Sequence, residues 1–166
     1  DVTGGVEESR LESSSLELHL DELVSEVDEM MHTIHRTYGE TSEVKDLDMT
    51  YLHLMGRHYI RTGEYEKGVR NILSLVEIAS EVRNLDYLLM GYKQMIYYDI
   101  QIGNTEEMRN YLELALNVAD ECNYHKEMGI LLRLKGLNMI MQGNFSEAER
   151  LLKESISTFM VTQSVQ

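Results

Sequence analysis

Three glycines recur at an interval of forty residues along the C-terminal two thirds of the chain: Gly63, Gly103 and Gly143. An amphipathic helical pattern precedes each glycine, over about 46–62, 85–102 and 125–142, and another follows it, over about 65–83, 105–121 and 145–160. So short a connection favours a residue that can take a positive φ, as glycine does without strain. The interval therefore predicts three helix pairs, over about 46–84, 85–124 and 125–163, within residues 46–166.

The composition favours helix along the whole chain. The 166 residues include no proline, the residue that most strongly interrupts helices, and are rich in Leu, Met and Glu. With 43% hydrophobic residues the chain can bury a core, and no apolar run approaches the eighteen residues of a membrane span. A single cysteine, Cys122, rules out a disulfide within the chain. We expect an all-α fold without a membrane segment.

The N-terminal part has a different character. Residues 1–12 contain Gly4 and Gly5 and no apolar period, so we expect a flexible lead, followed over 13–45 by an acidic helix and a linker. Its start carries a capping-box signature at residues 14–17. One apolar stripe runs along the helix: Leu16, Leu20, Leu23, Val27, Met30 and Ile34. We expect the helix to cap the helix pairs; the alternative is a coiled-coil arm of a homodimer.

Small residues recur inside the predicted pairs. Gly56 and Gly136 both lie seven residues before the turn glycine, where the middle pair has Ile96. Glycine in the middle of a helix costs about 1 kcal/mol relative to alanine. We therefore expect a neighbouring helix to approach closely at Gly56 and Gly136. Five residues after the turn glycines stand Gly68, Met108 and Ala148.

This pattern resembles the tetratricopeptide repeat over about residues 46–160. The resemblance is carried by these residues: Gly56, Tyr59, Gly63, Tyr65, Gly103, Leu112, Ala115, Gly136, Gly143, Phe145 and Ala148. It implies a right-handed superhelix of antiparallel helix pairs, with the first helix of each pair on the concave side. The family's usual repeat has 34 residues and a closing proline. Longer repeats without proline resemble those of bacterial transcription regulators.

If that architecture applies, one polar stripe of the first helices faces the groove. Its candidate ligand-binding residues are His53, Arg57, Arg61, Lys93, Tyr97, Gln101 and Arg133. Basic side chains on a concave surface can hold the carboxylates of an acidic peptide by charge-assisted hydrogen bonds. Lys93 and Arg133 resemble the carboxylate clamps of some tetratricopeptide domains. The alternative is that these cations are ordinary solvated residues paired with acidic neighbours.

Other kinds of site find little support in the sequence. The net charge is −14, with a net −11 in residues 1–48, and such a surface repels nucleic acid. His32 and His35 have helical spacing for a metal but no third ligand is anchored by spacing, and Cys122 with His125 is the one candidate nucleophile pair. We expect no enzyme, no cofactor and no metal.

These observations predict a protein- or peptide-binding helical repeat module in a cytoplasmic location. Its partner is a peptide or protein segment, with an acidic segment as one candidate. We expect it to be the sensory or scaffold part of a larger bacterial regulator, because no polar capping helix follows Met160. The alternative is an oligomerisation or spacer domain that holds a DNA-binding or catalytic partner domain.

Overall fold

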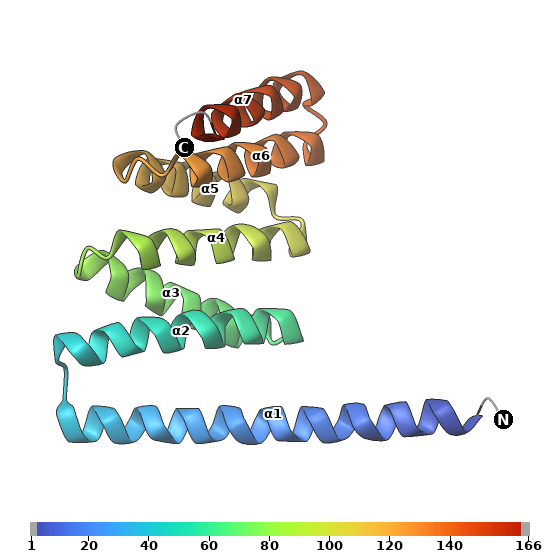
Figure 1. The fold of residues 1–166 in the computed structure, drawn as a ribbon, viewed down its shortest axis with the longest axis vertical. Coiled ribbons are helices and arrows are strands. Elements are labelled where there is room, and N and C mark those ends of the chain that lie inside the picture. The colour runs from blue at the N-terminus through green and yellow to red at the C-terminus, as the bar shows by residue number, and fades with distance from the viewer. Residues whose placement is uncertain (1–2, 164–166) are drawn as a thin grey trace. The chain divides into compact units, whose positions relative to one another are not determined.

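The computed structural model describes the backbone of residues 3–163 and the side chains of residues 18–161. Over that range it contains seven α-helices and no strand (Figure 1). They are α1 (Thr3–Tyr38), α2 (Ser42–Thr62), α3 (Tyr65–Glu81), α4 (Leu85–Ile102), α5 (Thr105–Glu121), α6 (His125–Met141) and α7 (Phe145–Gln163). The prediction of an all-α fold is confirmed, and among the described residues no helix is both long and apolar enough to cross a bilayer.

The chain divides into two compact units, Asp1–Asp48 and Met49–Gln166. In the first unit, α1 begins at Thr3, so the helix includes most of the segment for which the sequence predicted a flexible lead. Helix-favouring residues such as Glu7, Glu8 and Leu11 outweigh the cost of the two early glycines. The next helix, α2, begins at Ser42 rather than near residue 46.

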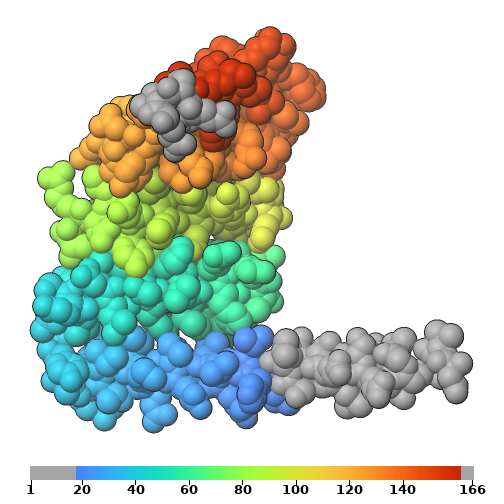
Figure 2. All heavy atoms as spheres, in the orientation of Figure 1, coloured from blue at the N-terminus to red at the C-terminus, as the bar shows by residue number. Residues whose placement is uncertain are grey.

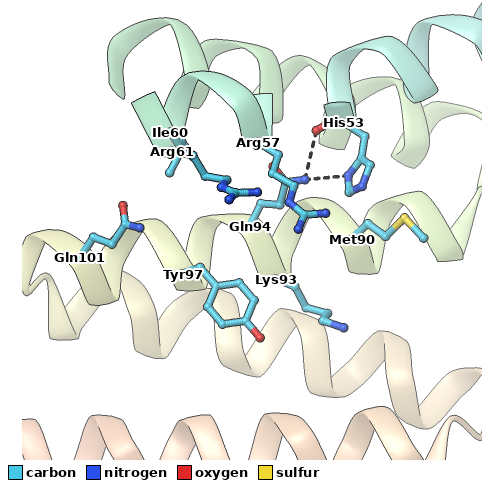
Figure 3. Close-up of a pocket in the computed structure, with 9 residues that line it drawn as sticks. All are labelled: His53, Arg57, Ile60, Arg61, Met90, Lys93, Gln94, Tyr97 and Gln101. Atoms are coloured by element: carbon cyan, nitrogen blue, oxygen red, sulfur yellow. Dashed lines mark hydrogen bonds between the residues drawn. The ribbon is translucent and has the colours of Figure 1, made fainter. Parts of the chain in front are cut away.

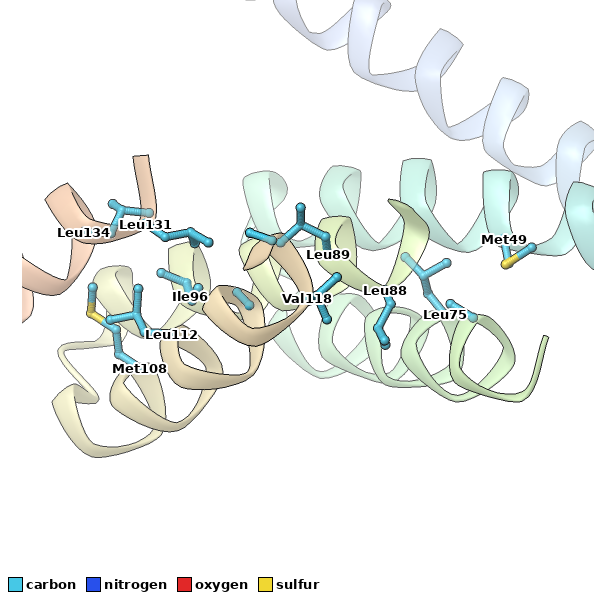
Figure 4. Packing of buried hydrophobic residues seen from close by; sticks show 13 residues of the cluster. Met49, Leu75, Leu88, Leu89, Ile96, Met108, Leu112, Val118, Leu131 and Leu134 are labelled. Atoms are coloured by element: carbon cyan, nitrogen blue, oxygen red, sulfur yellow. The ribbon is translucent and has the colours of Figure 1, made fainter. Parts of the chain in front are cut away.

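In the second unit, contacts join α3 to α4, α4 to α5, α5 to α6 and α6 to α7. In Figure 2 the colours accordingly cross residues 49–161 in successive bands, each next to its neighbours in sequence. One apolar cluster extends from α2 to α6 (Figure 4), and its most deeply buried members are Met49, Leu75, Ala79, Ile96, Met108, Leu112, Ala115, Ala119 and Leu131. Burial of apolar surface between consecutive helices therefore stabilises this unit.

The predicted close approach at the mid-helix glycines is confirmed. A Cβ added at Gly56 would lie 2.7 Å from Cγ1 of Ile72, and one at Gly136 would lie 3.1 Å from two carbons of Leu152. The middle pair has large residues at this level instead, and Ile96 and Met108 are fully buried there. The two helices of each pair therefore pack against each other at this level through side chains whose size differs from pair to pair.

The turn glycines also take the predicted conformation. Gly63, Gly103 and Gly143 have φ values of +86°, +73° and +77°. A second set of turns, which the sequence did not reveal, joins one pair to the next. There Arg83 and Asn123, again forty residues apart, take φ values of +54° and +56°. Both kinds of connection thus depend on one left-handed residue that reverses the chain.

Replacing Gly143 by valine should lower the free energy of unfolding by more than about 1 kcal/mol. No atom lies within 4 Å of the position that a Cβ would take at Gly143, so the whole cost comes from forcing a β-branched residue to a positive φ. The measurement is the midpoint of urea unfolding. Gly143→Asn is the control, because asparagine tolerates this conformation. Equal midpoints for the two variants would contradict this account of the turn.

Candidate functional site

A cavity of about 480 Å³ lies on α2 and α4, the first helices of the first two pairs (Figure 3). Its lining residues are His53, Arg57, Ile60 and Arg61 from α2, and Met90, Lys93, Gln94, Tyr97 and Gln101 from α4. Six of the seven candidate residues predicted from the sequence are among them. Residues four apart share a helix face, and equivalent positions on two packed helices lie close together, which explains why these six converge.

The seventh candidate, Arg133, does not line this cavity. It borders a separate cavity of about 320 Å³ whose other lining residues are Leu134, Leu137, Ile140 and Leu152. The expectation that Arg133 would join Lys93 in one basic groove is therefore not met. In the third pair the positions equivalent to Arg57 and Arg61 hold Leu137 and Met141, so the polar stripe becomes apolar there.

Gln94 connects the two helices inside the first cavity. Its side-chain nitrogen Nε2 donates to the backbone carbonyl oxygen of His53 at 3.2 Å and lies 2.7 Å from Nδ1 of the same histidine (Figure 3). Only the amide NH₂ group can donate to a carbonyl oxygen, so this contact fixes the orientation of the Gln94 amide. Nδ1 of His53 is then an acceptor, and the proton of the neutral ring is on Nε2.

The surroundings of His53 keep that ring neutral. Burial lowers the pKa of His53 below its usual value, and the nearby positive charge of Arg57 lowers it further. The ring also lies edge-on to the ring of Tyr87, whose hydroxyl is 2.7 Å from Oγ1 of Thr50. His53 therefore contributes a hydrogen-bond donor to this region without adding positive charge.

The cations in the cavity differ in how they are partnered. Nζ of Lys93 lies 2.6 Å from Oε2 of Glu127, and both side chains are largely buried. Lys93, a candidate ligand-binding residue, therefore already has a carboxylate partner, which α6 supplies. Among the described residues, neither Arg57 nor Arg61 has a carboxylate partner, and both extend from α2 toward α4 in Figure 3. Most of the other described cations of the second unit are in ion pairs, for example Arg70 with Glu66.

Two buried polar atoms of α4 were not predicted from the sequence. Oε1 of Gln94 and Oδ2 of Asp99 are buried and have no hydrogen-bond partner among the described residues. Burial raises the pKa of Asp99 to about 6, and the nearby charge of Glu107 adds to this effect. A signal was available in the forty-residue interval: the other pairs have Leu54 and Leu134 in place of Gln94, and Tyr59 and Met139 in place of Asp99.

The candidate metal ligands do not assemble into a site. Among the described residues there is no group of three or more His, Cys, Asp or Glu side chains that could hold a metal ion. His35 instead lies 2.7 Å from Oδ1 of Asp48 and 3.6 Å from Oε1 of Glu40. Cys122 is a partly buried free thiol.

Comparison with known proteins adds no family to this description. The sequence matches no protein-family model, and no curated protein or solved structure gives a match. The fold and the site thus define a class of protein and no family. The class is an all-α protein whose second unit carries a cavity lined by cationic and polar side chains on α2 and α4.

Proposed function

We propose that Met49–Gln166 is a protein- or peptide-binding helical repeat domain whose ligand lies along α2 and α4. The observation that carries the proposal is the cavity in which Arg57 and Arg61 have no carboxylate partner among the described residues. In an acidic protein, two such guanidinium groups on one face attract a negatively charged segment. The ligand is accordingly an acidic stretch of polypeptide that brings carboxylates to Arg57 and Arg61.

The remaining lining residues suit a polypeptide. A guanidinium group binds a carboxylate through two parallel hydrogen bonds. Ile60 and Met90 add apolar surface beside them. A cavity of about 480 Å³ is within the usual size range of ligand pockets.

The resemblance to tetratricopeptide repeats supports the same proposal. It implies a right-handed superhelix in which the first helices line the concave face. Under this proposal the domain is the cytoplasmic sensory or scaffold part of a larger bacterial regulatory protein. The rival function is that of an oligomerisation or spacer domain, in which Arg57 and Arg61 are solvated surface residues. The exposed apolar residues of α1 favour an oligomerisation role for the first unit, which is compatible with ligand binding by the second.

Replacing both Arg57 and Arg61 by glutamine should weaken the binding of acidic peptides by about 10- to 100-fold, since each of the two substitutions removes a charge-assisted contact. Titration calorimetry with a pool of Asp- and Glu-rich peptides, and with a Lys-rich pool of the same length, measures the effect. Binding to the wild type should weaken as salt rises, because exposed charges are screened.

The matched control is the double variant Arg70→Gln with Arg109→Gln. It removes the same charge from α3 and α5, where these arginines face Glu66 and Glu106. We expect the control to bind acidic peptides as the wild type does. Equal affinity of the wild type for the acidic and basic pools, or equal losses in both double variants, would leave the spacer function as the better explanation.

A further inference from the structure

The first unit carries a stripe of exposed apolar side chains on α1. Leu20, Leu23, Val27 and Met30 of α1 are 43%, 51%, 39% and 60% exposed. Together with the half-buried Ile34 they repeat at spacings of three, four, three and four residues. This is the heptad spacing of the core positions a and d of a coiled coil. Leu16 continues the spacing, but its side chain lies outside the described ones.

A different face of α1 serves the contacts within the first unit. Met31 is buried, and His35, one turn further along the helix, has Nε2 2.7 Å from Oδ1 of Asp48 in α2. Val44, near the start of α2, is buried as well. The contact between His35 and Asp48 therefore leaves Leu20, Leu23, Val27 and Met30 exposed.

We propose that the stripe from Leu20 to Ile34 pairs with the same stripe of a second copy of this chain, as a parallel two-stranded coiled coil. In this register Leu20, Val27 and Ile34 are a residues, and Leu23 and Met30 are d residues. Two of the three a residues, Val27 and Ile34, are β-branched and one of the two d residues, Leu23, is leucine; β-branched side chains at a with Leu at d favour two parallel strands. The pattern is complementary to itself, so a second copy fits it without any other partner.

The charges of α1 are compatible with this pairing. In a parallel dimer each g residue faces the e residue of the next heptad in the partner. Between Leu18 and Tyr38 these pairs join His19 with Val24 and Thr33 with Tyr38, while Glu26 faces the position of Met31, which is already buried in the first unit. No two like charges therefore face each other. The acidic residues Asp21, Glu22, Asp28 and Glu29 occupy positions b and c, outside the seam. Among the acidic residues of this stretch, Glu26 at position g therefore flanks the apolar contact and the other four lie outside it.

The size of the seam sets the expected strength of the dimer. Five apolar side chains from each chain place the interface near the lower limit of stable ones, about 1,200 Å² in total. We therefore expect a dimer that dissociates on dilution through the micromolar range. Higher salt should strengthen it, because salt screens the repulsion between two acidic helices. Salt has the opposite effect on the proposed ligand site, so the two inferences can fail independently.

Sedimentation velocity of the full chain over a dilution series tests the proposal, with Leu23→Lys and Leu18→Lys as matched variants. Leu23 is a d residue, whereas Leu18 is 65% exposed at position f, on the far side from the seam. Leu23→Lys should raise the dissociation constant at least tenfold and Leu18→Lys should leave it nearly unchanged. Circular dichroism should show the same helix content in both variants, because both positions are exposed.

The orientation is tested by cross-linking in a Cys122→Ser background. A parallel, in-register seam brings the two Val27 positions together, so Val27→Cys should form a disulfide-linked dimer on mild oxidation, while Leu18→Cys should not. A wild type that stays monomeric at about 200 µM, or a dimer that Leu23→Lys leaves intact, overturns the proposal. A dimer sensitive to Leu23→Lys but without the Val27→Cys cross-link overturns the parallel arrangement.

Discussion

Replacing Gly68 by alanine is expected to lower the free energy of unfolding by about 2–4 kcal/mol. The added Cβ would lie 2.7 Å from Cγ1 of Ile60, 2.9 Å from the backbone nitrogen of Ile60 and 3.0 Å from the carbonyl oxygen of Gly56. Two of these three atoms belong to the backbone of α2. The clash cannot be relieved by turning a side chain, so α2 and α3 would have to move apart.

Close packing and helix propensity predict opposite signs for the change in free energy of unfolding in Gly68→Ala. Helix propensity alone predicts that Gly68→Ala stabilises α3 by about 1 kcal/mol. The third pair provides a reference, because it has the fully helical Ala148 at the equivalent position and tolerates it. Urea unfolding of Gly68→Ala and of Ala148→Gly measures both helices, and Ala148→Gly should cost only about 1 kcal/mol. A Gly68→Ala variant more stable than the wild type would show that α2 and α3 are not in close contact.

Most of what could be predicted from the sequence came from the forty-residue interval between glycines. It located the helix pairs of the second unit and the left-handed turns at Gly63, Gly103 and Gly143. It also identified six lining residues of the cavity on α2 and α4, because residues at equivalent heights on packed helices become neighbours. The forty-residue period is sufficient to predict these features, because each one depends on a residue within one helix pair or on equivalent residues of two successive pairs.

The features that were not predicted depend on contacts between side chains that a repeating sequence pattern does not reveal. The pairing of Lys93 with Glu127 joins α4 to α6, and no local pattern indicates it. Arg133 has the expected position along its helix, yet its surroundings are apolar because α6 and α7 differ in sequence from the earlier pairs. Gln94 and Asp99 stand where the other pairs have larger or apolar residues, so comparison of equivalent positions would have identified both.

Asp99 should make the stability of the second unit depend on pH. Its side chain is 2% exposed, and its pKa in the folded chain is about 6, above the usual value of 3.8. Below pH 3.8 the Asp99 carboxyl is protonated in both the folded and the unfolded chain. The preference of the folded state for the protonated carboxyl therefore contributes its full stabilisation there. As the pH rises toward 6 and beyond, the unfolded chain releases this proton more readily, and the folded state loses about 2–3 kcal/mol of stability.

Comparing wild type with Asp99→Asn isolates this contribution, because asparagine does not titrate. The difference in free energy of unfolding between the variant and the wild type should increase by about 2–3 kcal/mol, in favour of the variant, from pH 4 to pH 7. Any fixed cost of burying the amide cancels in that comparison. Glu107→Gln should reduce the pH dependence only partly, since burial is the larger cause of the raised pKa. Urea unfolding at several pH values provides the measurement. A difference that stays constant with pH would mean that the Asp99 carboxylate is solvated, and that α4 and α5 do not bury it as the structure describes.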